Sequence, residues 1–284
     1  MNFKNNYLII SIIVVVVIVG VVGYSVLTGG STITIAGSTS VAPVTQALAT
    51  AYTSNHTNLR ISVSGGDSGV GINDARSGSV DIGTSSRNLT NSEVQGLSLY
   101  AIGQDAISLI VNPSNTVNDL SMDQVTGIYT GNITNWSQVG GSKSTIVPRT
   151  REAGSGTRAD FERFLNISSY GTQIQVDTFN YGLLQSVVTI PDSIGYISHA
   201  YLINEVKVLS VNNITPTQQT VQNGSYPLTR NLIFLTKGTP TGIVKNFINF
   251  CLSPEGQTIM NGTEWNNSNN SVYNPTSGIG PSGG

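Results

Sequence analysis

Charged side chains are scarce in this chain of 284 residues. Asp, Glu, Lys and Arg together make up 10% of it, whereas a soluble domain usually carries about 25%. The 13 basic residues and 15 acidic residues give a net charge of −2. A protein that binds nucleic acid needs a basic surface, so no nucleic-acid partner is expected.

Cysteine and histidine are nearly absent as well. A single Cys excludes an intramolecular disulfide and any zinc site built from several cysteines. Two His leave little for histidine-based metal chemistry. We therefore expect no metal and no cofactor. Because no pair of carboxylates and no nucleophile beside a base stands out, the sequence indicates a protein that is not an enzyme.

The N-terminus carries the one long apolar run. Residues 7–27 are 21 residues without a charge, and about 20 apolar residues suffice for a helix to cross a bilayer. A signal peptide has a shorter apolar core and ends in an A-x-A-like site, which is poorly matched here. We expect an uncleaved anchor within residues 1–30, with a cleaved signal as the alternative. Either one places the remaining chain outside the cytoplasm.

Potential glycosylation sites agree with export. The chain has ten N-x-[ST] sequons, and glycans on them would solubilise a surface that is poor in charge. Chance is the alternative, because Asn, Ser and Thr are common in this chain. The sequons begin at Asn55, Asn88, Asn132, Asn135, Asn166, Asn213, Asn223, Asn261, Asn266 and Asn269.

The exported part alternates between strand and helix patterns. Such alternation predicts an α/β fold with a mostly parallel sheet. The expected strands are 32–36, 60–63, 80–83, 106–111, 144–148 and 232–236, and the expected helices are 41–54, 71–76, 122–129, 156–165 and 242–251. Residues 263–284 are rich in Asn, Ser and Gly, which is typical of a flexible tail.

Four segments rich in Gly, Ser and Thr follow predicted strands or lead into predicted helices. They cover residues 37–40, 65–69, 81–87 and 151–158. The first turn of a helix leaves backbone N–H groups unpaired, and glycine lets the backbone approach a ligand closely. Combined with hydroxyl donors, such segments are typical of an anion site. In open α/β sheets they gather at the carboxyl ends of the strands.

Two arginines stand within these segments. The planar guanidinium groups of Arg87 and Arg151 suit the geometry of a tetrahedral oxyanion. A Ser or Thr at a helix start is most often only an N-cap, and Asp67 could equally cap a helix or close a turn. Four such segments in one charge-poor chain nevertheless favour an oxyanion-binding protein.

The order of the motifs resembles one known family. IAGSTSVAPVTQALATAY is followed by SGGDSGVGI, DIGTSSRNL, LSMDQVTGIYTGNITNWSQVGG, REAGSGTRADFERF, YPLTRNLIFLTKGTP and FINFCLSPEGQ. These motifs resemble the phosphate-binding proteins of ABC transporters, the PstS family. The resemblance implies an α/β, two-domain periplasmic-binding-protein-like (type II) fold with a ligand cleft, here preceded by an N-terminal transmembrane helix. It implies one domain at 31–111 plus 229–262 and a second at 112–228.

The resemblance also implies the residues that bind phosphate. Carried over by motif position, they are Ser38, Thr39, Ser40, Ser68, Ser86, Arg87, Arg151, Ser155, Gly156 and Thr157. Some family members have an Asp where this chain has Ser86, and that Asp accepts a hydrogen bond from protonated phosphate. Here Asp67 is the candidate acceptor, and a serine lone pair is the alternative. An acceptor carboxylate disfavours sulfate, which has no proton to offer.

The function implied is an extracytoplasmic phosphate-binding protein of an ABC importer that binds phosphate by cleft closure. Its expected partners are inorganic phosphate, the permease subunits of an ABC transporter and, through residues 7–27, the membrane. The protein is expected to be a monomer. The alternatives are a binding protein for sulfate, molybdate or tungstate, and a cell-surface structural protein that reuses the fold. A hydrolase of phosphoesters is a more distant alternative.

Overall fold

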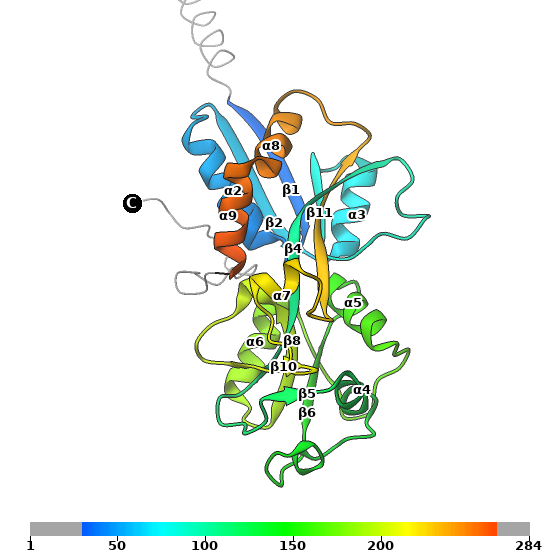
Figure 1. Ribbon diagram of the computed structural model, residues 1–284. Helices are drawn as coiled ribbons and strands as arrows, with labels where there is room; N and C mark the ends of the chain where they lie inside the picture. Colours follow the sequence, from blue (N-terminus) through cyan, green and yellow to red (C-terminus); the bar gives the residue numbers. More distant parts are fainter. Residues whose placement is uncertain (1–29, 266–284) are drawn as a thin grey trace, which may run out of the picture.

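One mixed β-sheet runs through both lobes of the molecule (Figure 1). The computed structural model describes residues 30–265. Within them, nine strands form this sheet in the order β2-β1-β3-β11-β4-β8-β6-β7, with β9 paired to β4, while β5 and β10 form a small second sheet. The strands are β1 (Ser31–Ser38), β2 (Leu59–Gly66), β3 (Ile82–Ser85), β4 (Leu97–Val111), β5 (Asp119–Leu120), β6 (Val147–Arg151), β7 (Gln175–Asp177), β8 (Ser193–Ser198), β9 (Lys207–Val208), β10 (Ser210–Val211) and β11 (Thr229–Lys237).

Helices cover the sheet in both lobes. They are α2 (Ala42–Ser54), α3 (Ser68–Ser77), α4 (Met122–Thr130), α5 (Gly156–Leu165), α6 (Phe179–Thr189), α7 (Gln218–Gln222), α8 (Gly242–Leu252) and α9 (Pro254–Trp265), with 3-10 turns η1 (Trp136–Val139) and η2 (His199–Tyr201). We call β1–β3, α2, α3, α8 and α9 the upper lobe, and α4–α7 with β5–β10 the lower lobe (Figure 1).

Two long strands join the lobes. β4 pairs with β11 along residues 97–106 and then with β8 along residues 107–111, so it passes from the upper lobe into the lower one. β11 returns beside it in the antiparallel direction. The sheet is therefore parallel only at its flanks, β1 with β2 and β3, and β6 with β7 and β8. The expectation of a mostly parallel sheet is wrong for the centre, because the chain crosses there and returns.

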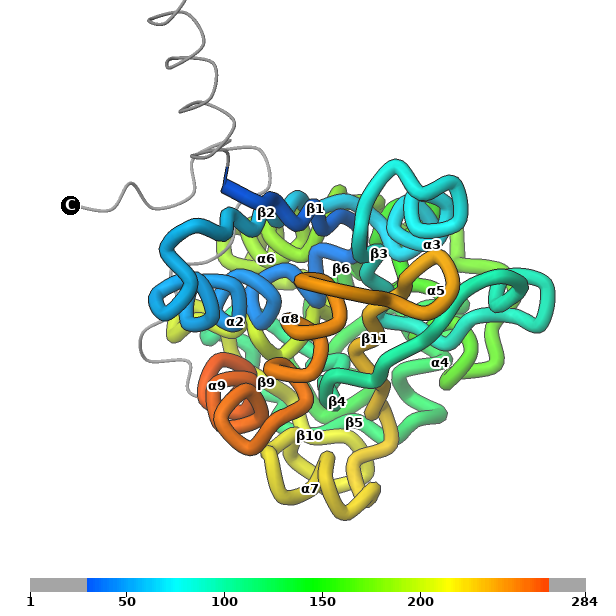
Figure 2. The backbone as a smooth tube through the Cα atoms, turned by 90° about the horizontal axis from the view of Figure 1, so that it is seen from above, coloured from blue at the N-terminus to red at the C-terminus, as the bar shows by residue number. Residues whose placement is uncertain are grey.

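The upper lobe has its own hydrophobic core. Ile33 of β1, Leu48 of α2 and Phe234 of β11 are fully buried in one cluster. The aromatic rings of Tyr52 and Phe247 lie 5.4 Å apart and join α2 to α8. Figure 2 shows that α2 and α9, which are distant in sequence, lie side by side. The C-terminal helices thus complete the lobe that the N-terminal segment begins.

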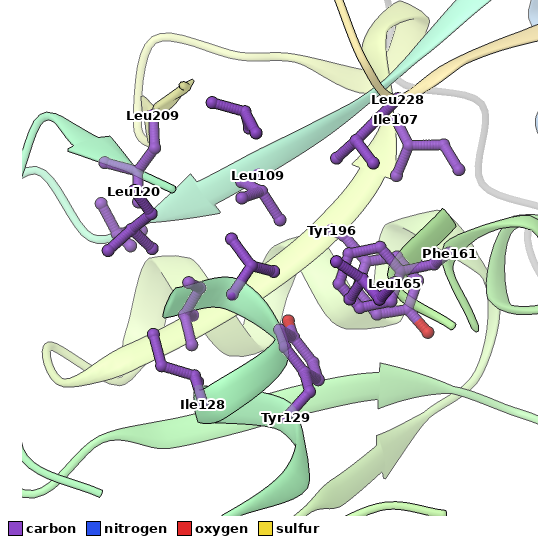
Figure 3. Packing of buried hydrophobic residues seen from close by; sticks show 14 of the residues in the cluster. Ile107, Leu109, Leu120, Ile128, Tyr129, Phe161, Leu165, Tyr196, Leu209 and Leu228 are labelled. Carbon is purple, nitrogen blue, oxygen red and sulfur yellow. The ribbon is translucent and has the colours of Figure 1, made fainter. Parts of the chain in front are cut away.

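A second core fills the lower lobe. Figure 3 shows residues of this cluster, among them residues of β4, β5, α4, α5 and β8. The rings of Phe161 and Tyr196 stack with their centroids 3.8 Å apart, and Tyr129 packs against Phe161 at 4.7 Å. The two largest clusters thus lie one in each lobe, and the predicted domain boundaries stay a prediction.

Local sequence signals explain several helix ends. Pro43 lies in the first turn of α2, where proline fits because its missing N–H would be unpaired anyway. Ser121 and Gln124 form a reciprocal capping box at the start of α4, and Gly131 ends that helix in the left-handed conformation. These signals place the helices that the sequence predicts at 41–54 and 122–129.

The predicted elements are found, with shifts and omissions. The strand expected at 144–148 is β6 at Val147–Arg151, and the strand expected to begin at residue 106 is the second part of β4, which begins at Leu97. Helices α6 and α9 and strand β8 were not predicted. Residues 263–265 of the expected tail belong to α9, which continues to Trp265, and the rest of the expected tail lies outside the described residues.

The predicted membrane segment at residues 7–27 lies outside the described residues. In the part of the chain from residue 30 to 265, no helix combines the length and the apolar character that crossing a membrane requires.

Candidate functional site

The ends of three upper-lobe elements bring serine hydroxyls together. Ser38 ends β1, Ser68 begins α3 and Ser86 follows β3. The Ser38 hydroxyl donates to Ser86 Oγ at 2.9 Å, and Ser68 Oγ lies 3.4 Å from Ser86 Oγ. β1 and β3 are parallel neighbours, so their carboxyl ends meet at one edge of the sheet. All three side chains are buried.

The lower lobe meets this edge at the start of α5. Thr157 Oγ1 lies 2.9 Å from Ser40 Oγ of the upper lobe. The backbone of Gly156 approaches so closely that an added Cβ would lie 2.1 Å from Ser68 Oγ. Only glycine permits this approach, which explains why a Gly stands at this position. We call the hydroxyl side chains gathered between the lobes the junction cluster, namely Ser38, Thr39, Ser40, Ser68, Ser86 and Thr157.

The hydroxyls of the junction cluster are not used as helix caps. No side-chain cap bond is present at the start of α2 or of α3. At α5 the capping role falls to Ser155, whose Oγ accepts from the backbone N–H of Arg158 at 3.3 Å. Ser155 is therefore a helix N-cap, whereas the hydroxyl groups of the junction cluster are not.

Asn180 of α6 binds two of these hydroxyls, and sequence reasoning did not predict this role. Its side-chain amide donates to Thr39 Oγ1 at 3.3 Å and to Ser40 Oγ at 3.0 Å. Its Oδ1 accepts from the backbone N–H of Ser198 at 3.1 Å. Because Asn180 belongs to the lower lobe, these bonds also cross the junction.

Arg151 ends β6 and is 1% exposed. Its Nε and Nη2 donate to the two carboxylate oxygens of Glu152 at 2.7 and 2.8 Å. Its Nη1 is buried and has no hydrogen-bond partner among residues 30–265. A buried N–H group without a partner is costly, so this nitrogen is a donor prepared for a ligand.

Asp67 precedes α3 and faces Glu152 across the junction. Desolvation raises the pKa of the Asp67 carboxyl to about 7, and its hydrogen bond with Glu152 and the negative charge of Glu152 act in the same direction. Asp67 Oδ1 is buried without a partner. The loop of Gly154 closes over this carboxylate, since a Cβ on Gly154 would lie 3.1 Å from Asp67 Oδ2. Oδ1 of Asp67 is thus an acceptor close to the cluster with no partner in the described part of the chain.

The structure does not bring Arg87 into the junction cluster. Its Nη1 and Nη2 donate to the carboxylate of Glu93 at 2.9 and 2.8 Å, and Nη1 also donates to the carbonyl oxygen of Asn88 at 3.1 Å. The Arg87 hydrogen bond also lowers the pKa of Glu93 to about 2. Arg87 is occupied by a local ion pair.

Arg230 is a buried arginine at the junction that sequence reasoning did not single out. It lies on β11, and its Nη1 donates to Thr157 Oγ1 at 2.9 Å and to Ser86 Oγ at 3.3 Å. Asp105 of β4 accepts from Arg230 Nε and Nη2 at 2.8 and 2.6 Å. The sequence does contain a signal for this pair. Asp105 directly precedes the apolar strand expected at 106–111, and Arg230 lies just before the one expected at 232–236. Because buried charges are normally paired, opposite charges beside two apolar strands indicate that the two residues pair.

Among residues 30–265, no group of three or more His, Cys, Asp or Glu side chains could hold a metal ion. His199 lies next to the junction, with its Nδ1 3.0 Å from Ser108 Oγ. Burial lowers the pKa of His199 to about 4, so its ring is neutral near pH 7. Hydroxyl, amide and guanidinium donors make this a site for an anion.

The comparisons with known proteins agree with this chemistry. The model of the PBP superfamily domain matches residues 23–255. The phosphate-binding protein PstS of Bacillus subtilis (strain 168) is 31% identical over 232 residues, which make up 79% of this chain and 76% of that protein.

Two solved structures are also similar. A substrate-binding protein with bound phosphate from Clostridium perfringens is 35% identical, with a TM-score of 0.80 over 82% of this chain and 98% of that one. An ABC-type phosphate transport receptor from Vibrio cholerae is 33% identical, with a TM-score of 0.70 over 81% of this chain and 98% of that one. The chain therefore belongs to the PBP superfamily and, within it, to the PstS-type phosphate-binding proteins.

Proposed function

We propose that this protein captures inorganic phosphate outside the cytoplasm and delivers it to the permease of an ABC importer. The relatives carry phosphate in their names, and one similar structure contains bound phosphate. Binding would require the lobes to part and then to close on the anion. The hydroxyl groups that now contact one another across the junction would turn to the ligand. No step of this cycle breaks or forms a covalent bond, so we propose a binding protein and not an enzyme.

The observation that carries the proposal is the unpaired Nη1 of Arg151 beside the junction cluster. The guanidinium is held by Glu152 through Nε and Nη2, which leaves Nη1 as the buried donor without a partner. A charged donor among hydroxyl groups from two lobes provides what a tetrahedral oxyanion needs. The same nitrogen would serve no purpose in a structural protein.

Phosphate is favoured over sulfate by Asp67. Hydrogen phosphate offers oxygen atoms that accept and one O–H that donates, whereas sulfate only accepts near neutral pH. Asp67 Oδ1 is a buried acceptor without a partner, so it can take the hydrogen bond from the phosphate O–H. Facing sulfate, the same oxygen would stay unpaired, which costs free energy. We therefore assign to Asp67 the acceptor role that Ser86 leaves open.

The surroundings of the protein are also part of the proposal. We propose that residues 7–27 anchor it in the membrane as a single-pass segment, with the lobes on the extracytoplasmic side and acting as a monomer. Several sequons would carry glycans, because many of their Asn side chains are exposed. The exposed ones within residues 30–265 are Asn55, Asn88, Asn132, Asn166, Asn213 and Asn223.

The test is a calorimetric titration of the full-length chain in detergent with phosphate, sulfate, molybdate and tungstate. We expect wild type to bind phosphate most tightly of the four anions. Arg151→Gln should lower the affinity for phosphate by about 10- to 100-fold, which is the contribution of one hydrogen bond from a charged donor. Arg60→Gln is the control, because Arg60 is exposed on β2. Wild type that prefers another oxyanion, or ignores phosphate, contradicts the proposal.

The same titration tests the acceptor. Asp67→Asn keeps the size of the side chain but allows its amide to donate. If Asp67 accepts a hydrogen bond from phosphate, Asp67→Asn weakens the affinity for phosphate by about tenfold. The affinity for sulfate stays unchanged or increases. An equal loss of affinity for both anions would show that Asp67 does not accept a hydrogen bond from the phosphate O–H group.

A further inference from the structure

Two arginines at the junction are held in the same way. Arg151 gives Nε and Nη2 to Glu152, and Arg230 gives Nε and Nη2 to Asp105. In both residues the carboxylate fixes one edge of the guanidinium and leaves Nη1 for the site. The side chains of Arg151 and Arg230 are each 1% exposed. The sequence predicted only the first of these two.

The Nη1 side of the Arg230 guanidinium faces the junction cluster. Its Nη1 donates to Ser86 Oγ of the upper lobe and to Thr157 Oγ1 of the lower lobe. Ser86 and Thr157 are both positions that the family motifs assign to phosphate. A nitrogen within hydrogen-bond distance of two such hydroxyls lies next to the atoms that would contact the anion.

The pairing with Asp105 prevents Arg230 from leaving this position. Asp105 is fully buried, and its other oxygen, Oδ1, accepts from the backbone N–H of His199 at 3.0 Å. The carboxylate is therefore fixed by a main-chain bond from the lower lobe while it holds the guanidinium. An arginine held in this way loses little conformational freedom on binding.

We propose that Arg230 is a second cationic ligand of the bound anion, in addition to Arg151. This inference rests on the proposed function. On binding, Nη1 of Arg230 would exchange a hydroxyl acceptor for an oxygen atom of the anion. Hydrogen bonds from charged donors are roughly twice as strong as neutral ones, so Arg230 is a main determinant of affinity. A site with two guanidinium groups can bind an anion tightly although the chain is nearly neutral.

The test must not leave a charge buried without its partner. Arg230→Gln alone would leave Asp105 uncompensated, which is strongly destabilising. We therefore use the double variant Arg230→Gln/Asp105→Asn, which keeps a neutral, hydrogen-bonding pair. The control is Arg149→Gln/Asp177→Asn, because Arg149 pairs with Asp177 through Nε and Nη2 in the same manner without contacting the cluster. Arg230→Lys retains the charge without the planar fork.

Each variant is made in the full-length chain and titrated with phosphate, sulfate and molybdate, and its thermal unfolding is recorded. We expect the Arg230 double variant to lose about 10- to 100-fold in phosphate affinity, and Arg230→Lys to lose less. The Arg149 double variant should bind like wild type. Unfolding midpoints close to wild type exclude a folding defect as the cause.

The outcomes separate this inference from the proposed function. If wild type binds phosphate and the Arg230 double variant binds it equally well, the inference is overturned and the function stands. If wild type binds sulfate or molybdate in place of phosphate, the proposed function is overturned. The change in affinity caused by the Arg230 double variant is then measured with the anion that binds. Should wild type bind none of the three anions, both are overturned.

Discussion

Several hydroxyl groups at the junction accept a hydrogen bond from a nitrogen donor, and this determines where their own hydrogen can point. Asn180 donates to Thr39 and Ser40, and Arg230 donates to Ser86 and Thr157. Each hydroxyl oxygen receives a donor and keeps one hydrogen to give. At the scale of single residues the site is therefore an array of donors, which suits an anion with several acceptor oxygens.

Gly156→Ala is expected to weaken phosphate binding without unfolding either lobe. The new methyl group would stand 2.1 Å from Ser68 Oγ and 2.8 Å from Ser86 Oγ, so the start of α5 could not reach the upper lobe. Losing one or two hydrogen bonds from this helix start to the anion would weaken binding by about 10- to 100-fold. Calorimetry should show this loss, and the unfolding midpoint should stay near that of wild type. Unchanged affinity would contradict the closed arrangement as the binding form.

The sequence identified those site residues that belong to local motifs. Ser38, Ser68 and Thr157 stand in Gly-rich segments, and the start of a helix is readable from such segments. Asn180 and Arg230 were missed because their partners are distant in sequence. Asn180 lies 141 positions from Thr39, and Arg230 lies 125 positions from Asp105. Only the folded chain brings such pairs together.

At the scale of elements, α3 lies unusually close to β3. A Cβ on Gly71 would lie 2.3 Å from the carbonyl oxygen of Thr84, and one on Gly83 would lie 2.1 Å from the carbonyl oxygen of Gly71. Two glycines at facing positions allow the backbones of helix and strand to touch. This contact places the start of α3, with Ser68, beside the end of β3, and so builds the upper half of the site.

Gly71→Ala is expected to destabilise the protein by about 1 to 3 kcal/mol, the usual cost of overpacking. Gly182→Ala is the matched control, because Gly182 lies within α6 with no backbone atom near its added Cβ. There alanine should stabilise by up to about 1 kcal/mol through its helix propensity. Urea unfolding of both variants measures the difference. If Gly71→Ala is as stable as wild type, the close contact is not required.

Elements with a clear apolar period were predictable, and elements without one were not. α2 and α4 show helical spacing and end signals. α6 begins after Thr178, whose side chain makes no cap bond, and includes Gly182, so it lacks the usual marks of a helix. β8 is buried throughout, and a short apolar run does not distinguish strand from buried helix. The first part of β4 lacks the continuous apolar run by which its second part was recognised.

At the scale of the whole molecule, all direct bonds of the junction must break when the lobes part. They include Ser40 with Thr157 and the backbone N–H of Gly69 with the carbonyl oxygen of Gly154 at 3.4 Å. β4 and β11 continue between the lobes and would carry the motion (Figure 1). The ion pair of Arg230 with Asp105 joins these two strands. A second guanidinium ligand would then lie at the hinge itself, where the anion and the connecting strands meet.

The carboxyl pair across the lobes should make closure depend on pH. Burial and the approach of Glu152 raise the pKa of Asp67 to about 7, above the ordinary value of 3.8, while Arg151 acts in the opposite direction. A carboxyl with a raised pKa binds its proton more tightly in the closed form. Its contribution to closure is therefore full below its ordinary pKa and is lost as the pH rises through about 7.

Asp67→Asn removes this titration, because an amide is neutral at every pH. We expect the dissociation constant of wild type for phosphate, divided by that of Asp67→Asn, to rise between about pH 5 and about pH 9, because only wild type loses a stabilising proton over this range. The ionisation of phosphate itself is common to both proteins, so the ratio of their two dissociation constants isolates Asp67. Calorimetric titrations across this range measure the ratio. A ratio that stays constant with pH would mean that the proton on Asp67 plays no part in closure.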